Sequence, residues 1–183
     1  MEERVERLTS TKSTQFRWAR SGKVSTLTDD GHIYAKITWV KSWGSLATGE
    51  SADGRWTLKR VGFLRPRVTV RIDGSQSDLA VVKMDWNGGG NVAFTDASSF
   101  NFIRAGFWHP ELVLADSMGG KVFTMTPSTG LGRMGATLEL ENEAARSSWR
   151  TSLLAIVGWY LSVLVAEYDQ NVTLIAAAGA SGR

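Results

Sequence analysis

The sequence predicts a mainly β protein, in which a closed antiparallel barrel of about 12 strands surrounds a buried hydrophobic C-terminal helix. Three observations lead to this fold class. Apolar and polar side chains alternate between Gly22 and about Glu141, turn dipeptides interrupt the alternation, and the fourteen residues from Leu153 to Ala166 carry no charge. We expect a single domain over residues 1–183, with strands in about 15–141, a helix in about 149–168 and a tail in 169–183.

The composition is that of a folded globular protein. Hydrophobic residues make up 43% of the chain and charged residues 21%, far from the composition of disordered chains. A net charge of +3 favours phosphate-bearing partners but falls short of the dense basic surface of a nucleic-acid-binding protein. The chain has no cysteine, which excludes disulfides and thiolate chemistry. The N-terminus, MEERVERLTSTKSTQF, has charges where a signal peptide needs an apolar segment, so we expect a cytoplasmic protein.

The strands are predicted from a period of two. In HIYAKITWV, Ile33 and Ile37 share one face with Ala35 and Trp39, whereas Tyr34 falls on the opposite face, which we expect to meet water. RVTVRI, DLAVVKMDW and KVFTM continue the pattern, and dipeptides such as Asp-Gly and Asn-Gly separate the segments. We expect about ten to twelve strands.

The number of strands indicates closure, and closure requires a filled lumen. An open antiparallel sheet of this size would leave reactive edges. About eight strands already give an interior that side chains just fill, so a wider barrel needs another filler. The run near the C-terminus, read as a helix, is apolar around its whole circumference. The side chains that we assign to this core helix are Leu153, Leu154, Ile156, Val157, Trp159, Leu161 and Leu164.

The length of the apolar run favours a core helix over a membrane anchor. Fourteen helical residues reach about 21 Å, short of the roughly 30 Å hydrocarbon core of a bilayer. Glu167 and Asp169 then end the run. We therefore expect no transmembrane span. The tail that follows contains VTLIAAA, which favours one further strand.

An all-β chain that ends in an apolar helix containing GWYL resembles the tubby C-terminal-like superfamily. The resemblance is carried by the segment from Gly54 to Phe63, the following RPRVTVR and the run from Leu153 to Leu164. These segments look like those of the uncharacterised prokaryotic relatives of the LURP-one-related and phospholipid scramblase proteins. The resemblance implies a roughly twelve-stranded barrel around a central helix. It also implies phosphoinositide binding on the outer face of the barrel or association with membranes. We assign no binding residue of this chain on the basis of the resemblance.

A basic cluster is the strongest candidate site. The alternation places Lys59, Arg67 and Arg71 on the outside of two neighbouring strands, and Arg65 lies between these strands beside Phe63. Such a patch suits lipid headgroup phosphates, with Phe63 and Leu64 as an apolar wedge. The alternative is a solvated strand face that is kept basic to discourage edge pairing. We assign anionic lipid binding to Lys59, Phe63, Arg65, Arg67 and Arg71.

Other motifs have simpler explanations. The spacing from Asp85 to Asn91, with Asp96, imitates part of a calcium loop, but a hairpin turn explains it better than a calcium site. Gly130 to Gly135 satisfies GxGxxG but precedes a strand instead of opening a helix. The two histidines, His32 and His109, lack metal-ligand spacing.

The sequence therefore predicts a non-enzymatic protein without a metal or cofactor. It contains no GxSxG or GxxxxGK[ST] motif, and its carboxylates are scattered over turns. Tryptophans such as Trp39 and Trp56 could stack on nucleic acid, but core packing explains them better. We expect a binding or tethering module for anionic phospholipid or phosphoinositide headgroups, peripheral at the membrane. A protein–protein scaffold and nucleic-acid binding through the basic face are the alternatives, whereas a carrier barrel would need an empty lumen.

Overall fold

The computed structural model describes residues 4–41, 44–62, 65–85, 88–106, 110–130 and 133–180, with side chains except at 129, 130, 133, 146 and 169–180. A short 3-10 helix (Leu8–Ser10) precedes the strands, and two helices follow them. The strands are β1 (Gln15–Ser21), β2 (Val24–Asp29), β3 (His32–Trp39), β4 (Leu46–Ser51), β5 (Gly54–Val61), β6 (Arg67–Ile72), β7 (Ala80–Met84), β8 (Gly90–Phe94), β9 (Ser99–Ala105), β10 (Glu111–Asp116), β11 (Lys121–Gly130) and β12 (Arg133–Leu140). The helices are α1 (Glu143–Ser147) and α2 (Trp149–Ala180).

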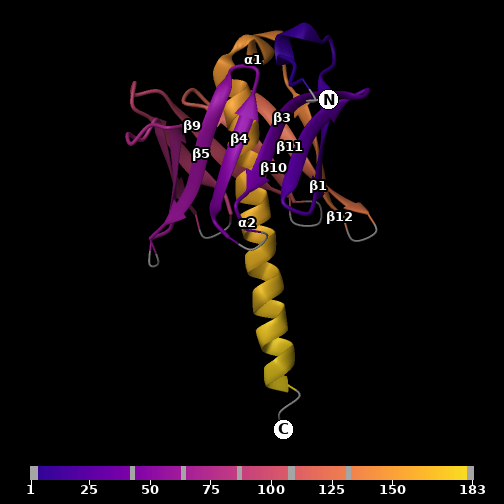
Figure 1. Ribbon diagram of the computed structural model, residues 1–183, viewed down its shortest axis with the longest axis vertical. Helices are drawn as coiled ribbons and strands as arrows, with labels where there is room; N and C mark the ends of the chain where they lie inside the picture. Colours follow the sequence, from indigo (N-terminus) through magenta and orange to yellow (C-terminus); the bar gives the residue numbers. More distant parts are fainter. Residues whose placement is uncertain are drawn as a thin grey trace.

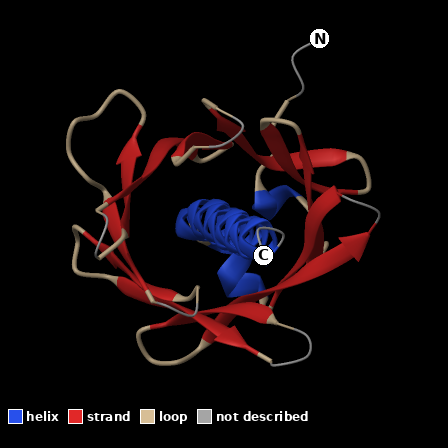
Figure 2. Ribbon diagram, turned by 90° about the horizontal axis from the view of Figure 1, so that it is seen from below, coloured by secondary structure: helices blue, strands red, loops and turns tan. Residues whose placement is uncertain are grey.

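The twelve strands form one closed antiparallel barrel, as the sequence predicts. Each strand pairs with its neighbours in the sequence, and β1 closes the ring by pairing with β12 through Phe16↔Leu138 and Trp18↔Ala136. Figure 2 shows the complete ring of strands with a helix at its centre. Closure leaves no strand edge unpaired, because every strand has a hydrogen-bonded neighbour on both sides.

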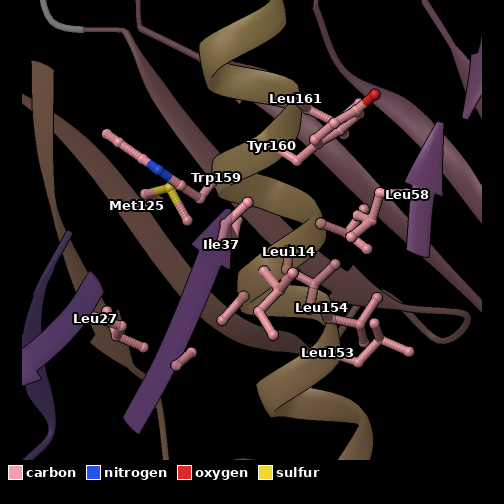
Figure 3. Close-up of a cluster of buried hydrophobic side chains, with 14 of the residues drawn as sticks. Leu27, Ile37, Leu58, Leu114, Met125, Leu153, Leu154, Trp159, Tyr160 and Leu161 are labelled. Carbon is pink, nitrogen blue, oxygen red and sulfur yellow. The ribbon is translucent and has the colours of Figure 1, made fainter. Parts of the chain in front are cut away.

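Helix α2 runs through the lumen and supplies the core that the strands cannot supply alone (Figure 1). All seven side chains that the sequence assigns to the core helix are at most 5% exposed. Figure 3 shows Leu153 and Leu154 of this helix among strand residues such as Leu58 and Leu114. The part of α2 from Trp149 to Tyr168 has the length and hydropathy of a membrane span, yet 72% of its most apolar 18-residue stretch is buried within the protein.

Close contacts fix the helix within the ring. At Gly49 of β4, an added Cβ would meet Ile156 Cγ2 at 2.5 Å, so only glycine leaves room for the helix there. On another side, the rings of Trp18 and Trp159 stack with their centroids 5.6 Å apart. Trp39 and Trp56 are also buried, which confirms the prediction that they pack in the core. Trp43, Trp86 and Trp108 lie outside the described residues.

The expected tail is wrong: α2 continues to Ala180 instead of ending near Tyr168, and the strand expected in VTLIAAA is a helix. A strand would need a hydrogen-bonding partner, and the closed barrel offers none. Alanine-rich sequence also favours a helix. As a result α2 leaves the barrel and projects beyond it (Figure 1). We call this end of the barrel the exit end and the opposite end, where α1 lies, the α1 end.

Tyr34 is a second correction, because it is 2% exposed and does not face water. The pairing of β2 with β3 shifts between Leu27↔Ala35 and Thr28↔Ile33, which leaves Tyr34 without an opposite residue. Such a bulge changes the direction in which a side chain points. The Tyr34 ring packs edge-on against Phe16 at 5.1 Å, so it belongs to the core.

Candidate functional site

The two ends of the barrel differ in charge. Seven ion pairs join described residues, and six of them lie at the α1 end. The connections at this end carry Asp30, Asp53, Asp73, Asp78 and Asp96. The six pairs are Arg7–Asp53, His32–Asp29, Arg55–Asp73, Arg71–Asp78, Lys121–Glu141 and Arg150–Asp96.

Near the exit end the outer face carries cations without such partners. Arg67 of β6 lies directly opposite Lys83 of β7, and Val61 of β5 lies on its other side. Lys59, two residues before Val61, is therefore the diagonal neighbour of Arg67 on the same face, and such neighbours are typically about 7–8 Å apart, within reach of long side chains. We call Lys59, Arg67 and Lys83 the basic patch.

The basic patch is exposed and has no acidic neighbour within ion-pair distance among the described residues. The residue opposite Lys83 on its other side is Asn91 of β8, whose side-chain amide donates to Asn101 Oδ1 at 2.9 Å. Like charges directly opposite each other in a sheet destabilise it. The fold therefore tolerates an electrostatic cost at Arg67 and Lys83 that a bound anion would remove.

The structure keeps part of the predicted site together. Lys59, Arg65 and Arg67 are exposed near the exit end. Arg71 is separate from them, because its Nε lies 2.7 Å from Asp78 Oδ1 at the α1 end. Phe63 and Leu64 lie outside the described residues. Lys83 was missed in the sequence, although its place in the alternation of AVVKM put it on an outer face.

More arginines surround α2 at the mouth of the exit end. Arg20, near the end of β1, contacts Glu167 of α2 at 3.1 Å. Arg60, near the end of β5, donates its backbone N–H to the Tyr160 hydroxyl at 3.1 Å, and its own side chain is exposed. Tyr160 in turn donates to the carbonyl of Ser45. Burial raises the pKa of Tyr160, so this hydroxyl stays protonated at any physiological pH.

A cavity of about 210 Å³ lies at the same end, between α2 and strands β9 to β12. An engineered apolar cavity of about 150 Å³ in another protein holds benzene, so this volume suits a small apolar group. The lining is mostly apolar, with exposed Arg104 and half-buried Glu111 as its charged members. Side chains of α2 that line it include Trp159, Ser162 and Val165.

The remaining sequence motifs form no site in the described residues. Asp85 and Gly89 hydrogen-bond across the β7–β8 hairpin, which confirms the turn, and Asp96 lies at the other end of β8. Gly130 and Arg133 pair across a hairpin, so GxGxxG opens no helix. His32 is exposed at the start of β3, while His109, Trp86 and Asn87 lie outside the described residues. Within the described ranges no three His, Asp or Glu side chains gather as metal ligands.

No family model matches the chain, and neither does any curated protein or solved structure. The function is therefore argued from the geometry of the barrel and its charges.

Proposed function

We propose that this protein is a non-enzymatic tethering module that binds anionic lipid headgroups through the basic patch. The observation that carries the proposal is the direct opposition of Arg67 and Lys83, with Lys59 diagonal to Arg67 and no carboxylate within ion-pair distance of the three among the described residues. Phosphate and carboxylate groups of lipids would supply the missing counter-charge.

The contrast between the two ends supports this assignment over a generally basic surface. At the α1 end Arg7, Arg55, Arg71 and Lys121 are paired with carboxylates, whereas the three cations of the basic patch lie toward the exit end without such pairs among the described residues. Each Lys or Arg near an anionic membrane contributes about 1 kcal/mol to the free energy of binding. Three such residues contribute about 3 kcal/mol, which raises the affinity roughly a hundredfold. Such a module would associate peripherally with the membrane. The resemblance to the tubby C-terminal-like superfamily is consistent with this proposal, since the tubby C-terminal domains in that superfamily bind phosphoinositides.

The test is cosedimentation with liposomes that are neutral, phosphatidylserine-rich or phosphoinositide-doped, at low and at physiological salt. The variant Lys59→Glu/Arg67→Glu/Lys83→Glu should lower partitioning onto anionic liposomes about a hundredfold or more. A matched control, Arg17→Glu/Arg55→Glu/Lys121→Glu, makes the same change in net charge away from the basic patch. It should retain most of the binding.

Other results would overturn the proposal. Equal losses in the two triple variants would mean that only net charge matters. If no liposome is bound by the folded wild type, a protein–protein scaffold becomes the better explanation. A third result would favour nucleic-acid binding as the function. The protein would then bind nucleic acid through the basic patch, with an affinity that falls steeply with salt, and would not bind liposomes.

A further inference from the structure

We propose that the barrel meets the membrane end-on, with the exit end against the lipid surface and the projecting part of α2 inserted into the bilayer. This inference deepens the proposed function and rests on it, because it names the surface that faces the lipid and the manner of contact. It is carried by the course of α2, by the apolar side chains around its exit and by the difference between the connections at the two ends.

The course of α2 comes first. Glu167 is held by Arg20 at the mouth, and the helix continues beyond it to Ala180 (Figure 1). After Asp169 no charged residue occurs before Ala180. The nine residues from Val172 to Ala180 rise about 14 Å as a helix, about half of the roughly 30 Å hydrocarbon core. A helical segment of this length suits insertion into one leaflet.

Exposed apolar side chains also occur at the exit end. Tyr168, on the last turn before the projecting segment, is 65% exposed, and tyrosine is enriched where proteins cross the membrane–water interface. Val40 is 55% exposed and Leu46 is 37% exposed, and they flank the β3–β4 connection at the same end. These three residues therefore add exposed apolar surface at the end of the barrel where α2 leaves it, and Ile72, Met118 and Trp149 expose apolar surface at the α1 end.

The connections at the two ends have opposite compositions. Those at the α1 end, all described, contain five aspartates and no aromatic residue. In the sequence of the connections at the exit end there is one aspartate, Asp85, and an abundance of aromatic residues. These aromatic residues, which lie outside the described ranges, are Trp43, Phe63, Trp86, Phe107 and Trp108.

The cations complete the match to an anionic bilayer. Lys41, Arg60 and Arg65 are exposed at the exit end, beside the apolar side chains. Among the described residues none of the three has an acidic partner within ion-pair distance. Apolar groups that enter the lipid with basic groups at headgroup level are the pattern of interfacial membrane binding.

The absence of cysteine from the chain makes the orientation directly measurable. A single cysteine would be introduced as Ala177→Cys in the projecting segment and, separately, as Met118→Cys at the α1 end, where Met118 is 93% exposed. Each variant would carry an environment-sensitive NBD fluorophore and would be mixed with phosphatidylserine-rich liposomes, with and without spin-labelled acyl chains. The emission of the label at 177 should shift to shorter wavelength and should be quenched by the spin labels. The emission of the label at 118 should show no shift and no quenching.

The outcomes separate this inference from the proposed function. If labelled protein cosediments with the liposomes but the label at 177 stays in water, the end-on inference is wrong and headgroup binding stands. If none of the labelled variants cosediments with the liposomes, both the headgroup-binding proposal and the end-on inference are wrong. A label at 177 that is already blue-shifted without liposomes, in a protein that light scattering shows to be a dimer, would mean that a second copy covers the segment instead of lipid.

Discussion

Arg20 of β1 and Glu167 of α2 form an ion pair at 3.1 Å where the helix leaves the barrel. Both side chains are less than one fifth exposed, and the Arg20 guanidinium also lies 4.6 Å from the centre of the Trp39 ring. The pair thus joins the first strand to the last buried turn of the chain. It lies where the buried part of α2 meets the part that projects beyond the exit end.

Breaking this pair should destabilise the protein. Glu167→Gln removes the negative charge that faces Arg20 at the point where α2 leaves the barrel, which should lower the free energy of unfolding by about 1–3 kcal/mol. Urea denaturation of the wild type, Glu167→Gln, Arg20→Gln and the double variant would measure the coupling. Additive losses in the double variant would show that the two side chains do not interact.

Close packing of α2 against β4 gives a second prediction. Gly49→Ala places a Cβ 2.5 Å from Ile156 Cγ2, and such overpacking typically costs about 1–3 kcal/mol. Gly44→Ala is a matched control, since its nearest neighbour would be Lys41 Cβ at an ordinary 3.5 Å. Thermal unfolding should show a lower midpoint for Gly49→Ala than for Gly44→Ala. Equal midpoints would mean that the helix can shift without loss.

The fold could be predicted because its determinants are local periods and lengths. The alternation in residues 67–72 identified β6, and the uncharged run from Leu153 identified the core helix. The end of α2 could not be predicted in this way. Val172 to Ile175 fit a strand locally, and only closure of the barrel, a property of all twelve strands together, removes the partner that a strand would need. The position of Tyr34 depended on a bulge that leaves no periodic signal.

The basic patch could be predicted only in part. Arg67 and Lys59 are near each other in the sequence and on adjacent strands, so alternation sufficed to place them on one face. Lys83 joins them through the register between β6 and β7, which the turn between these strands sets. Arg71 appeared equivalent to Arg67 by alternation, but it lies near the other end of the same strand and is paired with Asp78.

Core truncation in α2 should be far more damaging than truncation at the surface. Leu154 is fully buried between the helix and the strands, and Leu154→Ala should cost about 2–5 kcal/mol through lost burial and the cavity left behind. Val40→Ala, at a half-exposed position, should change stability by less than about 0.5 kcal/mol. Chemical denaturation of both variants would test this. Similar small losses would mean that the barrel does not depend on its central helix.

Alkaline pH should weaken the fold through its buried tyrosines. Burial raises the pKa of Tyr160, and burial together with the hydrogen bond to Asp29 raises the pKa of Tyr34 to about 12. Between pH 10 and 12 the unfolded chain loses these protons and the folded chain keeps them, so stability falls as pH rises, by about 1.4 kcal/mol per pH unit for each tyrosine. Tyr160→Phe should be less stable at pH 7, because Arg60 N–H and the Ser45 carbonyl lose a partner, but should show a shallower decline above pH 10. Urea denaturation at several pH values would measure both slopes, and parallel declines would show that Tyr160 ionises normally in the folded protein.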